Sequence, residues 1–528
     1  MRKKFYRVLL PLCLFFCAQL SGNGSPADVK PTVRQPAVAG QFYPAQPDEL
    51  QRMVDDFVAQ AAVPNLSGQI VALIAPHAGY IYSGKVAAHS YALLKGQKFE
   101  RVVVIAPSHF EAFPFNSVYN GDAYATPLGD VEVDKEFAAK LAKMSPLIEL
   151  SSRGHTPMQQ QGEHALEVEL PFLQRMLGKF KLVPIVMGEQ NYETERALGV
   201  SLAKMIQGTH TLIVASSDLS HYHPYEEASK IDHKTLKAIE RWDYLSLSLN
   251  LESRVWEACG GGPIVAAMIA AERLGARQAT VLKYANTGDV TGDHSRVVGY
   301  GAVALVKSES RPAETAFSLG QKEKEVLIQL AKKSVETVVR ERKMYEPPVS
   351  EYSALLEERG AFVTLKEKGE LRGCIGLITP EKPLYLSVRD AAAFAAVRDP
   401  RFSPVTAREL PDLEYEISVL TPFHRVLDVK EIRVGRDGLL MIRGGNEGVL
   451  LPQVPTEQGW DRKTFLEELC LKAGLPRQTW QDEAADIFAF SAIVFDEHKP
   501  PEAITPERPV FQKPTFPPGL QGLDSPRP

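Results

Sequence analysis

Short apolar runs alternate with amphipathic helical patterns from residue 69 to about residue 306. Runs rich in β-branched residues and as long as buried strands occur at 69–75, 101–106, 181–186 and 211–215. Helical spacing occurs at 85–94, 134–144 and 163–177. This alternation predicts an α/β fold, with a central, largely parallel sheet covered by helices on both faces. Two later strands, at 280–284 and 297–306, are expected to complete a first domain spanning residues 34–307.

The pattern changes after residue 307. Residues 308–320 are polar and lack an apolar period, which is typical of a linker. Strand-like runs then occur at 361–365, 371–378, 415–420, 438–443 and 487–495, with helical patterns at 321–342, 386–397 and 463–473. Their order predicts an α+β second domain over residues 321–497. Residues 498–528 are so rich in proline that we expect a disordered tail.

The first 24 residues have the composition of an export signal. Arg2, Lys3, Lys4 and Arg7 precede an apolar stretch of 13 residues, Val8 to Leu20. That stretch is shorter than the roughly 20 residues needed to span a bilayer, and it matches the apolar core of a signal peptide. An uncleaved signal anchor is the alternative. We therefore expect an exported protein that is periplasmic or membrane-tethered.

Composition narrows the classes of function. The chain has 528 residues, 44% hydrophobic and 24% charged, which suits a soluble protein of two domains. Its formal net charge of −5 provides no cationic surface for nucleic acid, so we expect no nucleic-acid partner. Two of the five cysteines lie in the signal segment, and the remaining three, Cys259, Cys374 and Cys470, are too few for a disulfide framework.

Ionisable residues follow three of the predicted strands directly. The first strand leads to His77, the second to His109, and the fourth to Asp218 and His221. In open α/β sheets ligands bind beyond the carboxyl ends of the strands, so these side chains are expected to converge on one edge. Ten of the twelve histidines precede residue 300, which also places histidine chemistry in the first domain. A hydrogen-bonded structural histidine remains the alternative at each single position.

Cys259 is the fifth candidate. It precedes three glycines, Pro263 and an apolar helix over residues 264–274, so the helix dipole is expected to favour its thiolate. The alternative is a small buried residue before a turn. Two imidazoles and one thiolate with open positions suit zinc, iron or copper better than magnesium or calcium.

Five motifs of the first domain resemble, in order and spacing, those of the Memo family. They are Ala75-Pro76-His77-Ala78-Gly79-Tyr80, Ala106-Pro107-Ser108-His109, Glu163-His164-Ala165-Leu166-Glu167, Ser216-Ser217-Asp218 with His221, and Cys259-Gly260 with Pro263-Ile264. The resemblance implies a fold similar to class III extradiol dioxygenases, with His77, His109 and Cys259 as metal ligands. It also implies that Asp218 and His221 lie in the same pocket. Glu163 and His164 either belong to that pocket or merely begin a helix.

One ligand departs from the pattern of those dioxygenases, which use two histidines and a carboxylate. A cysteine is softer and can be oxidised, so it favours copper or a redox role, and we expect iron or copper ahead of zinc. His221 is the candidate general acid or base because an imidazole titrates near neutrality, and Asp218 is close enough in sequence to orient it.

The second domain resembles the AMMECR-type domain through Leu371-Arg372-Gly373-Cys374-Ile375-Gly376, Asp399-Pro400-Arg401-Phe402 and Glu457-Gln458-Gly459-Trp460-Asp461. In prokaryotes this domain is associated with Memo proteins and a radical S-adenosylmethionine protein under the name AmmeMemoRadiSam. The resemblance therefore implies a functional link to such a protein, but no reaction. Cys374 and Cys470 are expected to be packed structural thiols; a nucleophilic Cys374 is the alternative, although no histidine lies near it in the sequence.

Three functions remain open from the sequence. The first is a metal-dependent redox or oxygenase-like protein centred on His77, His109 and Cys259, with an accessory second domain. The second is a binding module without catalysis, whose pocket holds a small molecule or a peptide. The third is a zinc hydrolase with His221 as its base. The sequence does not identify the substrate.

Overall fold

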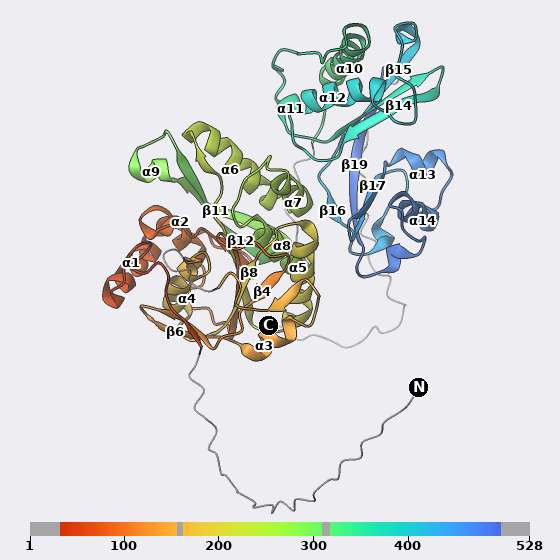
Figure 1. Cartoon of the computed structure of the whole chain (residues 1–528). Helices are drawn as coiled ribbons and strands as arrows, with labels where there is room; N and C mark the ends of the chain where they lie inside the picture. Colours follow the sequence, from red (N-terminus) through yellow and green to blue (C-terminus); the bar gives the residue numbers. More distant parts are fainter. Residues whose placement is uncertain (1–31, 156–161, 309–316, 498–528) are drawn as a thin grey trace, which may run out of the picture.

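The computed structural model describes residues 32–155, 162–308 and 317–497, and these form two domains built on separate sheets (Figure 1). The expected signal segment, the expected tail and most of the expected linker lie outside these residues. Within the described ranges, no helix has both the length and the apolar character required to cross a membrane.

A mixed sheet of nine strands forms the centre of the described first domain. Its order is β10 (His221–His223), β12 (Val297–Lys307), β2 (Gln69–Ala75), β9 (Thr211–Ser216), β3 (Arg101–Pro107), β8 (Lys181–Met187), β4 (Asn116–Val118) and β7 (Ile148–Leu150), and β11 (Gln278–Asn286) also pairs with β12. The four strands β2, β9, β3 and β8 are mutually parallel, whereas β12 and β4 flank them antiparallel. The predicted parallel centre is confirmed.

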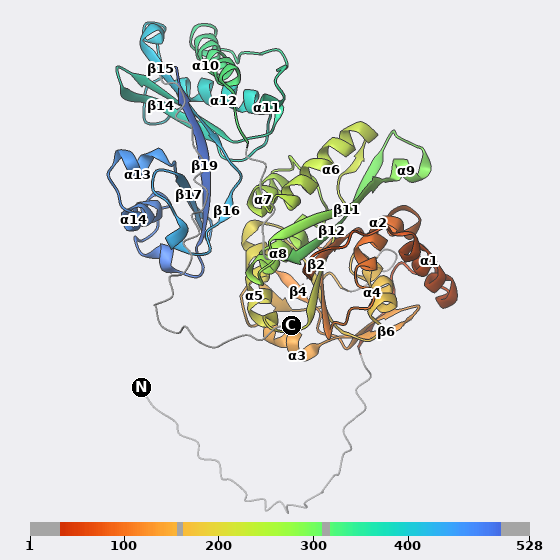
Figure 2. The same ribbon diagram turned by 180° about the vertical axis from the view of Figure 1, so that it is seen from behind.

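Helices cover both faces of this sheet (Figure 2). In β3, Val103 and Ile105 face one apolar cluster and Val102 and Val104 face another. Burial on both faces explains why these strands are continuous apolar runs instead of alternating patterns. The helices are α1 (Pro47–Gln60), α2 (Tyr80–Ala92), α3 (Lys135–Leu141), α4 (Leu170–Leu177), α5 (Tyr192–Ile206), α6 (Tyr225–Glu240), α7 (Tyr244–Glu252), α8 (Gly261–Arg273) and α9 (Thr287–Thr291). A small sheet of β1 (Val33–Arg34), β5 (Ala123–Thr126) and β6 (Gly129–Glu132) lies beside them.

Two helix boundaries differ from the sequence pattern in ways that matter for the site. The helix expected at 85–94 begins earlier, at Tyr80, directly after the loop that carries His77. The helix expected at 163–177 is reduced to a 3-10 turn at Glu167–Glu169 followed by α4, in which Pro171 occupies the first turn. Glu163 and His164 therefore lie in a loop and not in a helix.

The second domain is an antiparallel sheet with helices, as the order of its patterns predicted. Its described strands run in the order β14 (Glu370–Leu377), β13 (Ala361–Glu367), β15 (Leu413–Leu420), β19 (Asp486–Asp496), β17 (Asp437–Arg443) and β18 (Asn446–Leu450), and β16 (His424–Arg425) pairs with β19. The helices are α10 (Gln321–Glu341), α11 (Ser353–Leu356), α12 (Leu384–Val397), α13 (Gln453–Glu457) and α14 (Arg462–Lys472). Short 3-10 turns at Leu410–Asp412, Val429–Glu431 and Thr479–Gln481 complete the domain.

The two domains meet around Asp486, at the first residue of β19. Its side chain is 1% exposed and accepts hydrogen bonds from Tyr192 Oη at 2.8 Å and Arg196 Nε at 2.7 Å, both on α5. Arg273 at the end of α8 and Arg425 of the second domain also lie 3.2 Å from it. Burial alone would raise the pKa of Asp486, but these guanidinium groups lower it. One buried carboxylate therefore joins both domains.

Candidate metal centre

His77 follows β2 at the carboxyl edge of the parallel strands. Its side chain is 2% exposed, and its Nδ1 lies 2.7 Å from Ser216 Oγ at the end of neighbouring β9. Ser216 Oγ also donates to the carbonyl of Ala165 at 2.6 Å. Because a carbonyl can only accept, Ser216 accepts from His77 Nδ1–H, and the lone pair is left on Nε2. That Nε2 lies 3.2 Å from Cys259 Sγ.

His109 follows β3 and is held in a similar way by Glu163. The carboxylate of Glu163 accepts from the backbone N–H of His109 at 2.6 Å and lies 3.0 Å from its Nδ1. Burial alone would lower the pKa of His109, but the hydrogen bond and charge of Glu163 raise it. Burial would likewise raise the pKa of Glu163, whereas its bonds to His109 lower it to about 2. Glu163 is therefore ionised, and it directs Nε2 of His109 away from itself.

Cys259 lies between α7 and α8, far from both histidines in sequence. Its Sγ accepts from the backbone N–H of Asp218 at 3.3 Å. The turn packs tightly on β9, since a Cβ on Gly260 would come within 2.1 Å of the Ser216 carbonyl oxygen. Only glycine allows this approach.

The expected thiolate character of Cys259 is not supported. Burial, and after it the charge of Asp218, raises the pKa of the thiol. The nearby start of α8 does not compensate, because a helix end carries only about half an elementary charge and desolvation of the sulfur is larger. A neutral thiol at this position would have to lose its proton when a cation binds.

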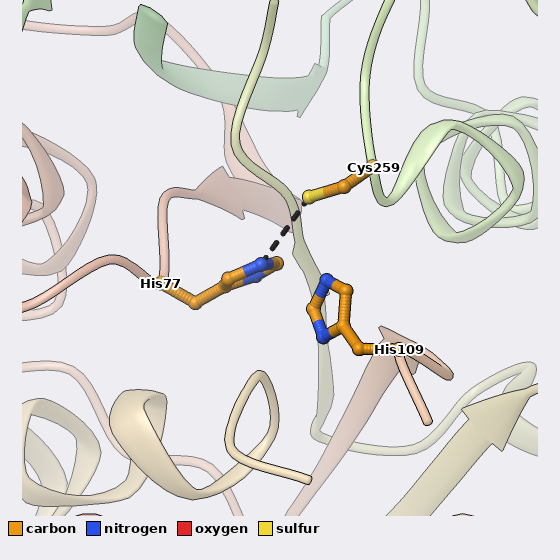
Figure 3. Close-up of side chains that lie close together, drawn as sticks. All are labelled: His77, His109 and Cys259. Carbon is orange, nitrogen blue, oxygen red and sulfur yellow. Dashed lines mark hydrogen bonds between the residues drawn. The ribbon is translucent and has the colours of Figure 1, made fainter. Parts of the chain in front are cut away.

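Figure 3 shows the three side chains pointing toward one another. One ligand atom from each of His77, His109 and Cys259 lies within 4.8 Å of the other two. His109, Glu163 and His164 form a second such group, and the rings of His109 and His164 stack with centroids 5.0 Å apart. Glu163 and His164 thus belong to the pocket, which settles the alternative left open by the sequence. Together these residues form a possible metal-binding cluster.

Asp218 and His221 lie at the same edge but do not form the expected pair. In the described part of the chain, Asp218 Oδ1 accepts from the backbone N–H of His77 at 2.9 Å, and burial raises the pKa of Asp218 to about 7. His221 begins β10, and its backbone N–H lies 3.3 Å from Glu257 Oε2. Asp218 follows β9, whereas His221 begins β10. The strands β2 and β12 lie between β9 and β10 in the sheet, so the chain changes direction between the two residues. Asp218 therefore supports His77 instead of orienting His221.

A buried ion pair supports the loop of Glu163 and was not found by sequence reasoning. Arg34, 4% exposed, pairs with Glu167 and also donates to the carbonyl oxygens of Glu163 and His155. Glu167 in turn accepts from Tyr43 and from the backbone of Ala37. Arg34 and Glu167 are separated by 133 positions, so no spacing in the sequence could have indicated this contact.

Cys374 in the second domain has different neighbours. Thr364 Oγ1 lies 3.3 Å from its sulfur, and its backbone N–H donates to Asp399 Oδ2 at 2.8 Å. Arg401 binds the same carboxylate. Among the described residues, the groups of histidine, cysteine and carboxylate ligands compact enough to hold a metal all lie in the first domain. Cys470 belongs to α14 and is buried in the core of the second domain.

Comparisons with known proteins match both domains. Residues 34–304 match the family model described as Memo-like protein, and residues 328–495 match that of AMMECR1. A MEMO1 family protein of Methanopyrus kandleri is 36% identical over 283 residues, covering 52% of this chain and 98% of its own. One from Methanocaldococcus jannaschii is 39% identical over 291 residues, covering 52% and 99%. An uncharacterized protein of Pyrococcus horikoshii, of known structure, has 43% identity, covers 33% of this chain and 92% of its own, and gives a TM-score of 0.32.

Proposed function

The chain belongs to the Memo-like protein family and carries an AMMECR1 domain, and we propose that its first domain is a redox centre binding iron or copper. His77, His109 and Cys259 are the proposed ligands. The observation that carries the proposal is the convergence of their ligand atoms within 4.8 Å at one edge of the sheet. We also propose that this domain shares the fold of class III extradiol dioxygenases, with a cysteine in place of their carboxylate ligand.

The hydrogen bonds behind the histidines support a metal. Ser216 and Glu163 occupy the Nδ1 atoms of His77 and His109, so each ring keeps Nε2 for a cation. Metal-binding histidines characteristically donate their other N–H to such an acceptor, which fixes the ring and raises its basicity. Three protein ligands leave further coordination positions open, as catalytic sites require. Bound iron or copper would supply electron transfer and activation of a coordinated substrate oxygen.

The neighbouring residues would handle protons. Burial lowers the pKa of His221, so its imidazole is neutral and able to accept a proton. Asp218 holds the backbone of His77, and with a pKa of about 7 it can exist in either protonation state near neutrality. In this proposal His221 is the general acid or base, and Asp218 positions His77.

Metal analysis tests the proposal. Protein purified and reconstituted without oxygen is expected to bind one iron or copper ion. Its cobalt form is expected to show a thiolate-to-cobalt charge-transfer band, which Cys259→Ser abolishes. Cys374→Ser is the matched control, since Cys374 is also a partly buried free cysteine. His77→Ala should lose the ion, whereas His210→Ala, at an exposed position, should keep it.

Other outcomes separate the alternatives. Failure of the reconstituted protein to bind any metal would overturn the redox centre and favour a pocket that binds a small molecule or a peptide without catalysis. Binding of zinc alone, with hydrolytic activity that requires His221, would favour the hydrolase. We further propose that the N-terminal segment exports the chain, and recovery of the uncleaved full-length product in the cytoplasm after fractionation would contradict this.

A further inference from the structure

A cavity of about 430 Å³ lies between the two domains. Helices α6 and α7 and Trp256 form its first-domain wall, and residues 353–360, 378–380 and 420–423 of the second domain form the other. In Figure 1, α7 lies on the side of the first domain that faces the second. The volume falls within the roughly 300–1,000 Å³ typical of small-molecule sites. None of the candidate metal ligands lines this cavity, so it is separate from the metal centre.

Two buried donors in the cavity wall have no partner among the described residues. Ser246 on α7 is 1% exposed and Trp256 is 5% exposed, and neither Ser246 Oγ nor Trp256 Nε1 makes a hydrogen bond there. A buried polar group without a partner destabilises the folded state, and such groups are rare in native proteins. The indole N–H can only donate. Both donor atoms have almost no accessible surface, so an occupant reaches them only when the cavity wall adjusts, and it must then present an oxygen or another acceptor.

Four cations and three carboxylates line the cavity, so one positive charge is in excess and favours an anion. Lys234 pairs with Glu358 at 2.6 Å, and Arg359 pairs with Glu357 at 3.0 Å. Asp243 caps α7 by accepting from the backbone N–H of Ser246 at 3.1 Å.

Two cations remain at the cavity. Lys237 and Arg241 also line it, and neither has a carboxylate within 4.0 Å in the described part of the chain. Their positive charge can be compensated by the charge of a ligand.

Part of the second-domain wall is apolar. Ile378, Leu420 and Phe423 of the second domain line the cavity together with Ala238 of the first. Aliphatic and aromatic surfaces of this kind stabilise the apolar body of a ligand by removing it from water. A purely inorganic anion would leave this wall without a contact.

We propose that this cavity is a second ligand site, for a small organic acid with an apolar aliphatic or aromatic body. Its carboxylate is neutralised by Lys237 and Arg241 and, after a small adjustment of the wall, accepts from Ser246 and Trp256. Its body packs between the domains against Phe423. This site lies outside the metal centre and does not depend on the function proposed for that centre.

Calorimetric titration of the full chain with 4-phenylbutyrate and with octanoate tests the proposal, each against its neutral amide. At least one carboxylate is expected to bind saturably, one per chain, and at least tenfold more tightly than its amide. Trp256→Phe, which removes the N–H and keeps a ring, and Arg241→Gln should each weaken binding about tenfold, as expected for one hydrogen bond to a charged group.

Two matched variants serve as controls. Trp242→Phe also removes a buried indole N–H without a partner among the described residues, but Trp242 does not line the cavity. Lys230→Gln removes an exposed cation from α6, again outside the cavity. Both should bind like the unmodified chain, and so should His77→Ala, which tests independence from the metal centre. Absence of saturable binding by both carboxylates, equal binding of the amides, or equal weakening by the control variants would overturn the proposal.

Discussion

Cys259 in the first domain and Cys374 in the second have similar local surroundings. Each lies beside a glycine packed against another backbone: an added Cβ would come within 2.1 Å of the Ser216 carbonyl at Gly260 and within 2.3 Å of the Ala395 carbonyl at Gly373. Burial raises the pKa of both thiols. Judged by residue type and local packing alone, the two cysteines would be expected to share one role.

Their tertiary neighbours separate them. Cys259 lies at the edge where parallel strands end, and so it faces the imidazole of His77. Cys374 lies within β14, at the edge of an antiparallel sheet, beside Thr364 and the Asp399–Arg401 ion pair. The strand ends of a parallel sheet gather side chains from distant segments, whereas the middle of an edge strand does not. The comparison teaches that topology, more than the cysteine motif, places the metal-binding chemistry.

The largest expected effect comes from Gly260→Ala. The new methyl group would collide with the Ser216 carbonyl and displace Cys259 from His77. Metal affinity, measured by competition with a chelator, should fall by about 100-fold. This is the upper end of the range for mutations that disturb the support of a metal ligand. Gly79→Ala is the control on the same edge, since its nearest neighbours lie at 3.7 Å. Unchanged affinity in Gly260→Ala would show that the tight turn does not position the sulfur.

A smaller effect is expected from Glu163→Gln. The amide of the new glutamine carries no charge, so it cannot raise the pKa of His109 as Glu163 does. The imidazole becomes a less basic ligand, and metal affinity should fall about tenfold. Asp399→Asn is the counterpart in the second domain, where a buried carboxylate holds Arg401 and the N–H of Cys374. It should lower the free energy of unfolding by about 1–3 kcal/mol and leave metal affinity unchanged. Loss of metal from Asp399→Asn would contradict the conclusion that only the surroundings of Cys259 hold the metal.

The last prediction concerns pH and the carboxylates of the two domains. Burial raises the pKa of Glu195 on α5 to about 8, where Ser248 on α7 is its hydrogen-bonding partner at 2.6 Å. The folded state thus holds a proton that the unfolded state releases above the ordinary glutamate pKa of 4.5. This contribution is complete below that value and is lost as pH rises toward 8, with a slope of at most about 1.4 kcal/mol per pH unit.

Denaturant unfolding of Glu195→Gln across pH 5 to 8 measures this slope, which should be shallower than in the unmodified chain. Glu193→Gln, at an exposed position of the same helix, should not change it. Asp399 has the opposite sign: its hydrogen bond from Arg401 lowers its pKa to about 2, so its contribution is lost on acidification below the ordinary aspartate pKa of 3.8. Identical slopes in Glu195→Gln and the unmodified chain would mean that Glu195 is not protonated when folded.

Much of the site could be predicted because strand ends are visible in a sequence. His77 and His109 follow apolar runs directly, and parallel pairing of β2, β9 and β3 brings those ends together. Cys259 was found by its place before a helix. The role of Glu163 could not be predicted, because the same residues fit the start of a longer helix. The partner of Asp218 was also missed, since the direction of a loop side chain is not encoded by spacing.

The sequence by itself determined the order of strands and helices, the division into two domains, and the chemical types available at the strand ends. Periodicity is sufficient for this, because each element buries its own apolar face. Only the tertiary structure decided which polar groups meet and in which protonation state. His77 and Cys259 are separated by 182 positions, and their contact, like the raised pKa of the thiol, arises from folding and desolvation of the whole domain.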